Sequence, residues 1–272
     1  MSLLRVSLLM LTLLMASTSH ADTTEFDTKI NDATTVLQSL QSLPERAIPP
    51  ALLRRARAIV VLPDFLKFGV VLGGSHGRGV MNVRSENGWS APVFVTLSGG
   101  SIGFQAGVQR SDLVLVFTND EGVRNITRGK FTLGADASVA AGPIGRRTTA
   151  ATDYKFDAAV YSYSRAKGIF AGVSITGAAL RIDDDANAAF YATVAIQPER
   201  IIAGEVTLMP DSARNLRATL PRLLQGMAAA PAPASPGTPA SVPTPEPASN
   251  GVTTYAIGER PAATTADNDD DE

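Results

Sequence analysis

The stretch LGADASVAAGPIGRR, from Leu133 to Arg147, consists almost wholly of glycine, alanine and serine with single aliphatic residues. A second stretch of this kind, GIFAGVSITG, follows at residues 168–177. Such segments gain little from burying large side chains, but glycine lets backbones approach closely and adopt φ angles that other residues resist. We therefore expect the domain to pack around these two small-residue segments.

The sequence around these segments predicts mostly strands, with helices towards both ends of the chain. Asn87-Gly88 between two apolar alternating runs is a strong hairpin signal. Short aliphatic runs predict strands at 59–62, 68–72, 79–84, 89–97, 103–108, 112–118, 161–164 and 168–182. Apolar spacing, prolines and acidic caps predict helices at 25–43, after Pro49-Pro50, at 120–126, 186–191, 196–202 and 212–224. This order predicts an α+β fold, a mainly antiparallel β-sandwich or barrel-like body with N-terminal and C-terminal helices.

The N-terminus has the pattern of a secretory signal peptide. Arg5 precedes the apolar run 6–15, and Ser19-His20-Ala21 resembles a small-x-small cleavage site. The run is shorter than the roughly 20 apolar residues that span a bilayer. We expect cleavage after Ala21, with an uncleaved membrane anchor as the alternative. The mature protein is then exported to the periplasm or cell envelope of a Gram-negative bacterium, peripheral to the membrane.

The rest of the chain divides into one domain, 22–226, and a tail, 227–272. The tail is rich in alanine, proline, threonine and serine and ends in acids, a composition that cannot bury a core and predicts disorder. The chain has no cysteine, so an exported domain must be held by its core alone. It carries 24 basic and 26 acidic residues, but signal and tail hold two of the bases and seven of the acids. The remaining 22 bases and 19 acids make the domain about +3.

Motifs for catalysis and metal binding are incomplete. Gly73-Gly74-Ser75-His76-Gly77 matches G-x-S-x-G, but the chain has only one other histidine, in the predicted signal, so a glycine-rich hairpin or bulge is the better interpretation. The S-x-x-K match at 164–167 lacks its companion motifs. Asp183, Asp185 and Asn187 alternate as in a calcium loop, but its glycine and final glutamate are missing, which favours helix capping. No nucleotide-binding glycine pattern is present. We expect no catalytic residues, no metal, no cofactor and no nucleic acid partner.

Clusters of basic residues remain as candidates for a binding site. Residues 46–84 contain seven bases and one acid, and residues 124–167 contain eight bases and three acids. Each base near an anionic membrane can contribute about 1 kcal/mol. With Phe65 or Phe68 beside them, several bases on one face could hold the protein on anionic lipid. The alternative is a solvated face or internal ion pairs.

Several sequence motifs, in the same order along the chain between Ala51 and Tyr191, resemble the SYLF domain. This domain is a lipid-binding module that is also described as actin-binding in fungal proteins. The blocks that carry the resemblance are LLRRA at 52–56, IVVLP at 59–63, GWSAP at 88–92, DLVLV at 112–116, residues 133–147, YSRAKGIFAGVS at 163–174 and residues 183–191.

The resemblance implies binding of phosphoinositides or other anionic lipids and no catalytic activity. In eukaryotic members an N-terminal amphipathic helix is implicated in lipid contact. Here the helix at 25–43 departs from that pattern, because three acids outweigh Lys29, and we expect its apolar face to pack on the domain instead.

We therefore predict a non-enzymatic, phosphoinositide-like lipid-binding module of the cell envelope that docks through a convergent basic surface. The predicted lipid-binding residues are Arg54, Arg55, Arg57, Lys67, Arg146 and Arg147. The first alternative is a periplasmic protein-interaction or scaffolding module without lipid binding, whose partner is an envelope protein. The second is a hydrolase, although the parts of a catalytic triad are missing.

Overall fold

A computed structural model describes residues 18–42, 48–69, 72–102, 107–129, 131–143, 156–166, 169–172 and 175–228. All of them belong to one compact unit that ends at Ala230. The predicted signal and tail lie outside the described residues, except for 18–21 and 227–228, which are helical.

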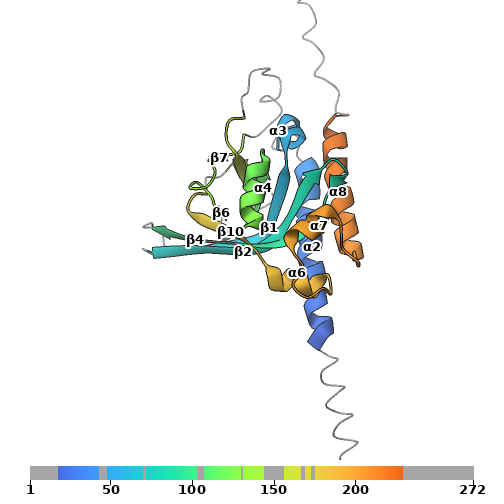
Figure 1. Ribbon diagram of the computed structural model, residues 1–272. Helices are drawn as coiled ribbons and strands as arrows, with labels where there is room; N and C mark the ends of the chain where they lie inside the picture. Colours follow the sequence, from blue (N-terminus) through green and yellow to red (C-terminus); the bar gives the residue numbers. More distant parts are fainter. Residues whose placement is uncertain are drawn as a thin grey trace, which may run out of the picture. The chain divides into compact units, whose positions relative to one another are not determined.

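The elements follow the predicted order, with strands in the middle of the chain and helices towards both ends (Figure 1). The helices are α2 (Thr18–Ser42), α3 (Pro50–Arg55), α4 (Asp120–Thr127), α6 (Asp184–Phe190), α7 (Pro198–Ala203) and α8 (Asp211–Ala228). The strands are β1 (Ala58–Gly69), β2 (Leu72–Ser85), β3 (Gly88–Trp89), β4 (Val93–Ile102), β5 (Gly107–Phe117), β6 (Phe131–Thr132), β7 (Val139–Ala141), β8 (Val160–Ala166), β9 (Ile169–Gly172) and β10 (Ala178–Ile182).

One curled sheet forms the body, in the order β6-β10-β4-β2-β1-β5-β8-β7, with β3 paired to β2 and β9 to β8. Its described pairings are antiparallel except that of β7 with β8. The predicted α+β fold with a mainly antiparallel, barrel-like body is confirmed.

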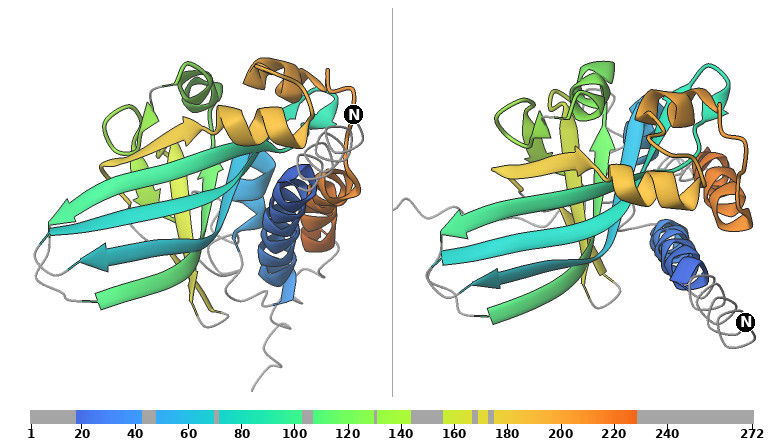
Figure 2. Two further views of the ribbon diagram at one scale, coloured as in Figure 1. Left: turned by 90° about the horizontal axis from the view of Figure 1, so that it is seen from below. Right: turned by 60° about the horizontal axis from the view of Figure 1, so that its bottom comes forward.

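Helices cover both faces of the sheet at one end of its long strands. Helix α2 contacts β1 and β2 and packs along α8, whereas α4 contacts β10, β5 and β6 on the inside of the curl. Residues 58–63 of β1 are all buried, because they are covered from both sides. At the other end, β1, β2, β4 and β5 run on past the helices (Figure 2). This uneven cover gives the sheet two different ends.

The N-terminal helix is part of the core. Ile30, Ala33 and Leu37 of α2 are buried, and the ring of Phe26 packs edge-on at 5.2 Å from that of Phe94 in β4. Three- and four-residue spacing places these side chains on one helix face. The expectation that this face packs on the domain is confirmed.

Strand β1 differs from the sequence prediction, which separated 59–62 from 68–72. A bulge keeps it continuous: its register with β2 shifts between Val61 and Leu66, and Asp64 has a φ of 54°. Proline has no N–H for the ladder and is found in sheets at edges or bulges. Pro63-Asp64 therefore bends the strand instead of ending it. The predicted hairpin is confirmed, with Ser85 opposite Gly88 and a φ of 100° at Gly88.

The two small-residue segments lie away from the centre of the sheet, which corrects the expectation that the domain packs around them. Strand β7, in the first segment, is the last strand of the order, and β9, in the second, has β8 as its one partner among the described strands. One close approach is present, because a Cβ on Gly142 would lie 2.0 Å from the Tyr163 ring. The centre is β2-β1-β5, in which larger aliphatic residues are concentrated in the first half of β1 and the second half of β5.

Candidate functional site

Helix α3 presents arginines because its apolar residues all face the core. Pro50 begins the helix, Leu52 and Leu53 are buried, and the chain leaves through buried Ala56 into β1. Arg54, Arg55 and Arg57 are left exposed at this corner. Arg84, near the end of β2, joins them, because its N–H donates to the Arg57 carbonyl at 2.7 Å. We call Arg54, Arg55, Arg57 and Arg84 the arginine cluster.

Two cluster arginines are held by aromatic rings. The guanidinium of Arg55 lies 5.6 Å from the centre of the Phe156 ring, and that of Arg84 lies 6.0 Å from the Trp89 ring. Arg84 also donates from Nη1 to the Arg54 carbonyl oxygen, at 2.9 Å, near the negative end of α3. A cation over a ring keeps its charge and loses mobility, so these guanidinium groups are oriented without being neutralised.

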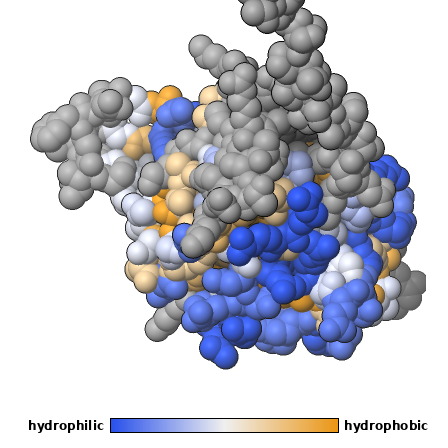
Figure 3. Space-filling view, turned by 90° about the horizontal axis from the view of Figure 1, so that it is seen from above, coloured by the Kyte–Doolittle hydropathy of each residue, from blue (hydrophilic) through white to orange (hydrophobic). Residues whose placement is uncertain are grey.

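In the described part of the chain, one acid forms an ion pair with the cluster. Arg57 Nε lies 3.7 Å from Asp120 Oδ1 at the start of α4, and both side chains are more than half exposed. Exposed pairs of this kind contribute little, typically 1 kcal/mol or less. Among the described residues Arg54 has no ion pair. The arrangement can therefore receive an anion with several charges. Much of the described surface at this end is hydrophilic, with hydrophobic areas beside it (Figure 3).

The structure does not bring all six predicted residues together. Arg54, Arg55 and Arg57 adjoin, but Lys67 lies ten residues further along β1, which is roughly 33 Å at 3.3 Å per residue. The prediction that Lys67 joins the arginines on one convergent basic surface is therefore wrong. Arg146 and Arg147 lie outside the described residues. Arg84 was missed as a site residue because its neighbours come from distant parts of the chain.

Lys67 belongs to the other end of the sheet. Here β1, β2, β4 and β5 continue as residues 66–69, 72–78, 98–102 and 107–110, which we call the four-strand end. Phe68 is 48% exposed and Val108 is 73% exposed, although both are large apolar residues. They are direct partners across β1 and β5. This end therefore presents apolar side chains to solvent.

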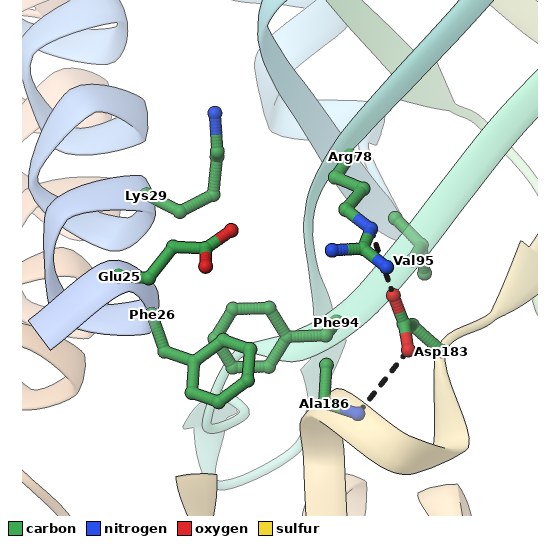
Figure 4. A pocket seen from close by; sticks show the side chains of 8 residues that line it. All are labelled: Glu25, Phe26, Lys29, Arg78, Phe94, Val95, Asp183 and Ala186. Carbon is green, nitrogen blue, oxygen red and sulfur yellow. Dashed lines mark hydrogen bonds and ion pairs between the residues drawn. The ribbon is translucent and has the colours of Figure 1, made fainter. Parts of the chain in front are cut away.

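A shallow recess lies between α2 and the sheet (Figure 4). Phe26 and Phe94 form its apolar side, and the charged groups of Glu25, Lys29, Arg78 and Asp183 surround it. Arg78 Nε is 3.5 Å from Asp183 Oδ2. With two acids and two bases, this recess does not select an anion.

Asp183 has a structural role at this recess. Its carboxylate accepts from the Ala186 N–H at 3.2 Å, as an N-cap of α6, and from the Thr96 hydroxyl at 3.3 Å. The interpretation of the acidic run as helix capping is confirmed. Within the described ranges, no three His, Cys, Asp or Glu side chains gather as metal ligands would.

The G-x-S-x-G match lies in strand β2, which pairs antiparallel with the preceding strand β1, so its interpretation as part of a glycine-rich hairpin is confirmed. Ser75 donates weakly to the Gly99 carbonyl oxygen, at 3.4 Å, across the β2–β4 pair. Neighbouring strand residues point to opposite faces, so His76 cannot act as a base for Ser75. Of the helices in the described part of the chain, none combines the length and hydropathy needed to cross a bilayer.

Comparison with protein families finds a match for the second half of the domain. A family model described as "Ysc84: Las17-binding protein actin regulator" matches residues 98–223. That range contains β5, α4 and most of the C-terminal elements, but it begins after α3 and the arginine cluster.

Individual relatives extend the similarity. Protein YSC84 of Saccharomyces cerevisiae is 36% identical over 177 residues, which is 64% of this chain and 37% of the relative. SH3 domain-containing YSC84-like protein 1 of Xenopus laevis is 33% identical over 189 residues, 69% of this chain and 55% of the relative. LAS seventeen-binding protein 3 of Saccharomyces cerevisiae is 37% identical over 151 residues, 54% of this chain and 33% of the relative.

The chain thus spans between about a third and about a half of the relatives it matches. The family description refers to Las17 binding and actin regulation, and the name of LAS seventeen-binding protein 3 refers to binding.

Proposed function

Because this chain belongs to the SYLF (Ysc84) family, we propose that it binds anionic lipid headgroups through the arginine cluster and catalyses no reaction. The observation that carries the proposal is that four arginines adjoin at one corner of the fold, and that among the described residues a single ion pair, Arg57–Asp120, is formed by them. We assign the principal headgroup contacts to Arg54 and Arg55, because Arg57 is paired with Asp120.

The chemistry of the cluster suits a phosphate group. A guanidinium offers several N–H donors in one plane and binds phosphate oxygens in pairs. Near an anionic surface each base contributes about 1 kcal/mol, so three of them give roughly a hundredfold gain in affinity. Phosphoinositide-like headgroups fit best, since they offer several phosphates over a short distance.

The site of action follows from the N-terminal sequence. We place the protein in the envelope of a Gram-negative bacterium, exported by the signal pattern at residues 1–21 and peripheral to the membrane. The lipid would then be an anionic phospholipid of that envelope.

A second candidate is protein binding without lipid, with an envelope protein as partner. The descriptions "Las17-binding protein actin regulator" and "LAS seventeen-binding protein 3" of the similar proteins favour it. This candidate predicts a crosslinked envelope partner and no sedimentation with vesicles.

The test is co-sedimentation with vesicles that contain anionic phospholipid. The triple variant Arg54→Glu, Arg55→Glu, Arg57→Glu should lose the salt-sensitive part of binding. A matched control, Arg128→Glu, Arg200→Glu, Arg214→Glu, makes the same charge change at exposed arginines outside the cluster and should bind nearly as the parent chain does. Equal thermal unfolding of the two variants would show that both are folded. If both bind vesicles equally, the cluster is not the lipid site.

A further inference from the structure

The four-strand end combines exposed apolar residues with a basic row behind them. Of the described residues, four large apolar side chains are exposed, namely Phe68, Val108, Val194 and Leu208. Two of these four, Phe68 and Val108, are adjacent on the last part of β1 and β5. Exposed apolar groups that lie together mark an interaction surface more often than scattered ones do.

The register of the sheet puts these residues in rows. Phe68 pairs with Gly74 on β2 and with Val108 on β5, whereas Leu66, two residues back, pairs with His76 and Arg110. Residues two apart on a strand share a face. On this face the apolar row of Phe68 and Val108 therefore lies nearer the end of the strands than the row with Arg110 and His76. Lys67 lies on the opposite face at the same level, beside Ser75 and Gln109.

The apolar row has a firm support. The Phe68 ring lies over Gly74, where an added Cβ would come within 2.7 Å of it. Glycine at this position leaves room for the ring on the strand surface. Phe68 is therefore held in place while about half of it faces solvent.

The charge of this end has one sign. The four strand ends, residues 66–69, 72–78, 98–102 and 107–110, contain no aspartate or glutamate, and their bases are Lys67, Arg110 and Arg78. Of these, Arg78 is paired with Asp183, which leaves Lys67 and Arg110 to set the charge. The nearest acid along β5, Asp112, is engaged by Arg165 Nε at 2.6 Å. A partner of opposite charge with an apolar interior behind its charged surface would match both rows.

From these observations we propose that the four-strand end is a second lipid-contact surface, which inserts Phe68 and Val108 into the bilayer interface. The cations Lys67 and Arg110 then lie at the depth of the anionic headgroups, as long basic side chains do at membrane interfaces. The proposal rests on the proposed function for its ligand class only. Its residues are separate from the arginine cluster, roughly 35 Å away along β1.

Insertion is tested with a fluorophore whose emission depends on polarity. Since the chain has no cysteine, Val108→Cys gives a unique site for a nitrobenzoxadiazole label, and Leu208→Cys gives a control at an exposed site on a different part of the chain. Adding vesicles of anionic and neutral phospholipid should shift the emission of the Val108 label to the blue and leave the Leu208 label unchanged. Nitroxide-labelled lipids should quench the Val108 label.

Binding itself supplies the second measurement. Phe68→Asp with Val108→Asp should weaken vesicle binding at high salt roughly tenfold or more, because two apolar side chains no longer leave water. Val194→Asp with Leu208→Asp makes the same kind of change at exposed sites and should leave binding unchanged.

The outcomes separate this surface from the arginine cluster. A Val108 label that stays in water while the protein sediments with vesicles would overturn insertion and leave the proposed function standing. A blue shift that grows with protein concentration in the absence of vesicles would also overturn it, because a second copy would then occupy this surface. The triple glutamate variant of the cluster should keep the blue shift at saturating vesicle concentration.

Discussion

The two ends of strand β1 differ in burial and in the side chains that they present to solvent. At the α3 end, residues 58–62 are buried on both faces, and the surface is made of arginines held by aromatic rings and by a backbone carbonyl. At the four-strand end, Lys67 and Leu66 are only half-buried and Phe68 and Val108 face solvent. Helices cover the first end and not the second (Figure 2). One end therefore offers charge on a rigid support, and the other offers apolar groups with charge behind them.

The largest predicted effect is a difference in stability loss between two glycine-to-alanine substitutions, one in the closely packed part of the sheet and one in the four-strand end. A Cβ on Gly79 would lie 2.0 Å from the Val61 carbonyl oxygen, whereas a Cβ on Gly100, in the four-strand end, would meet nothing within 4 Å. Gly79→Ala should lower the free energy of unfolding by about 3 kcal/mol or more, because backbone must move. Gly100→Ala should change it by about 0.5 kcal/mol or less. Urea denaturation of both variants measures the two free energies of unfolding. Equal losses would contradict the claim that the two ends differ in packing.

The bulge of β1, between the two ends, is the site of an intermediate predicted effect on stability. Asp112 accepts from Arg165 Nε at 2.6 Å and from the Asp64 N–H of the bulge at 3.2 Å, and its side chain is mostly buried. Asp112→Ala should cost about 1–2 kcal/mol of stability and speed amide exchange in β1 and β5 beyond the bulge. Asp157→Ala, at an exposed acid, is the control. Unchanged exchange in these strands would mean that Asp112 does not fix the four-strand end.

The acid beside the arginine cluster predicts the smallest effect. Asp120→Asn removes the partner of Arg57 and adds one unit of positive charge, so affinity for anionic vesicles should rise by up to about fivefold. Glu121→Gln makes the same charge change one residue away, without that ion pair, and should raise affinity less. Vesicle titration compares them, and a drop in affinity for Asp120→Asn would argue that Arg57 needs its partner in order to be positioned.

Local features of the fold were readable in the sequence. The spacing of Ile30, Ala33 and Leu37 predicted a helix that packs on the body, Asn87-Gly88 predicted the hairpin, and Asp183 predicted a cap. Each depends on residues close together in the chain, where backbone preference and side-chain spacing decide the outcome.

Features set by distant pairing were not readable. Pro63-Asp64 suggested a break, but pairing with β2 and β5 on both sides keeps β1 continuous through a bulge. The place of Arg84 beside Arg54 and Arg57 comes from the β2–β1 register, and that of Val108 beside Phe68 from the β1–β5 register. Charge counting alone grouped Lys67 with the arginines, although β1 carries it to the opposite end.

The salt dependence of vesicle binding tests the central claim most directly. The account assigns electrostatic binding to the arginine cluster, and screening by salt weakens such binding. Between low and high salt, the parent chain should lose much of its affinity for anionic vesicles, whereas the Arg54→Glu, Arg55→Glu, Arg57→Glu variant should bind weakly with little change. A triple variant that binds as tightly as the parent and loses affinity as steeply would contradict the account.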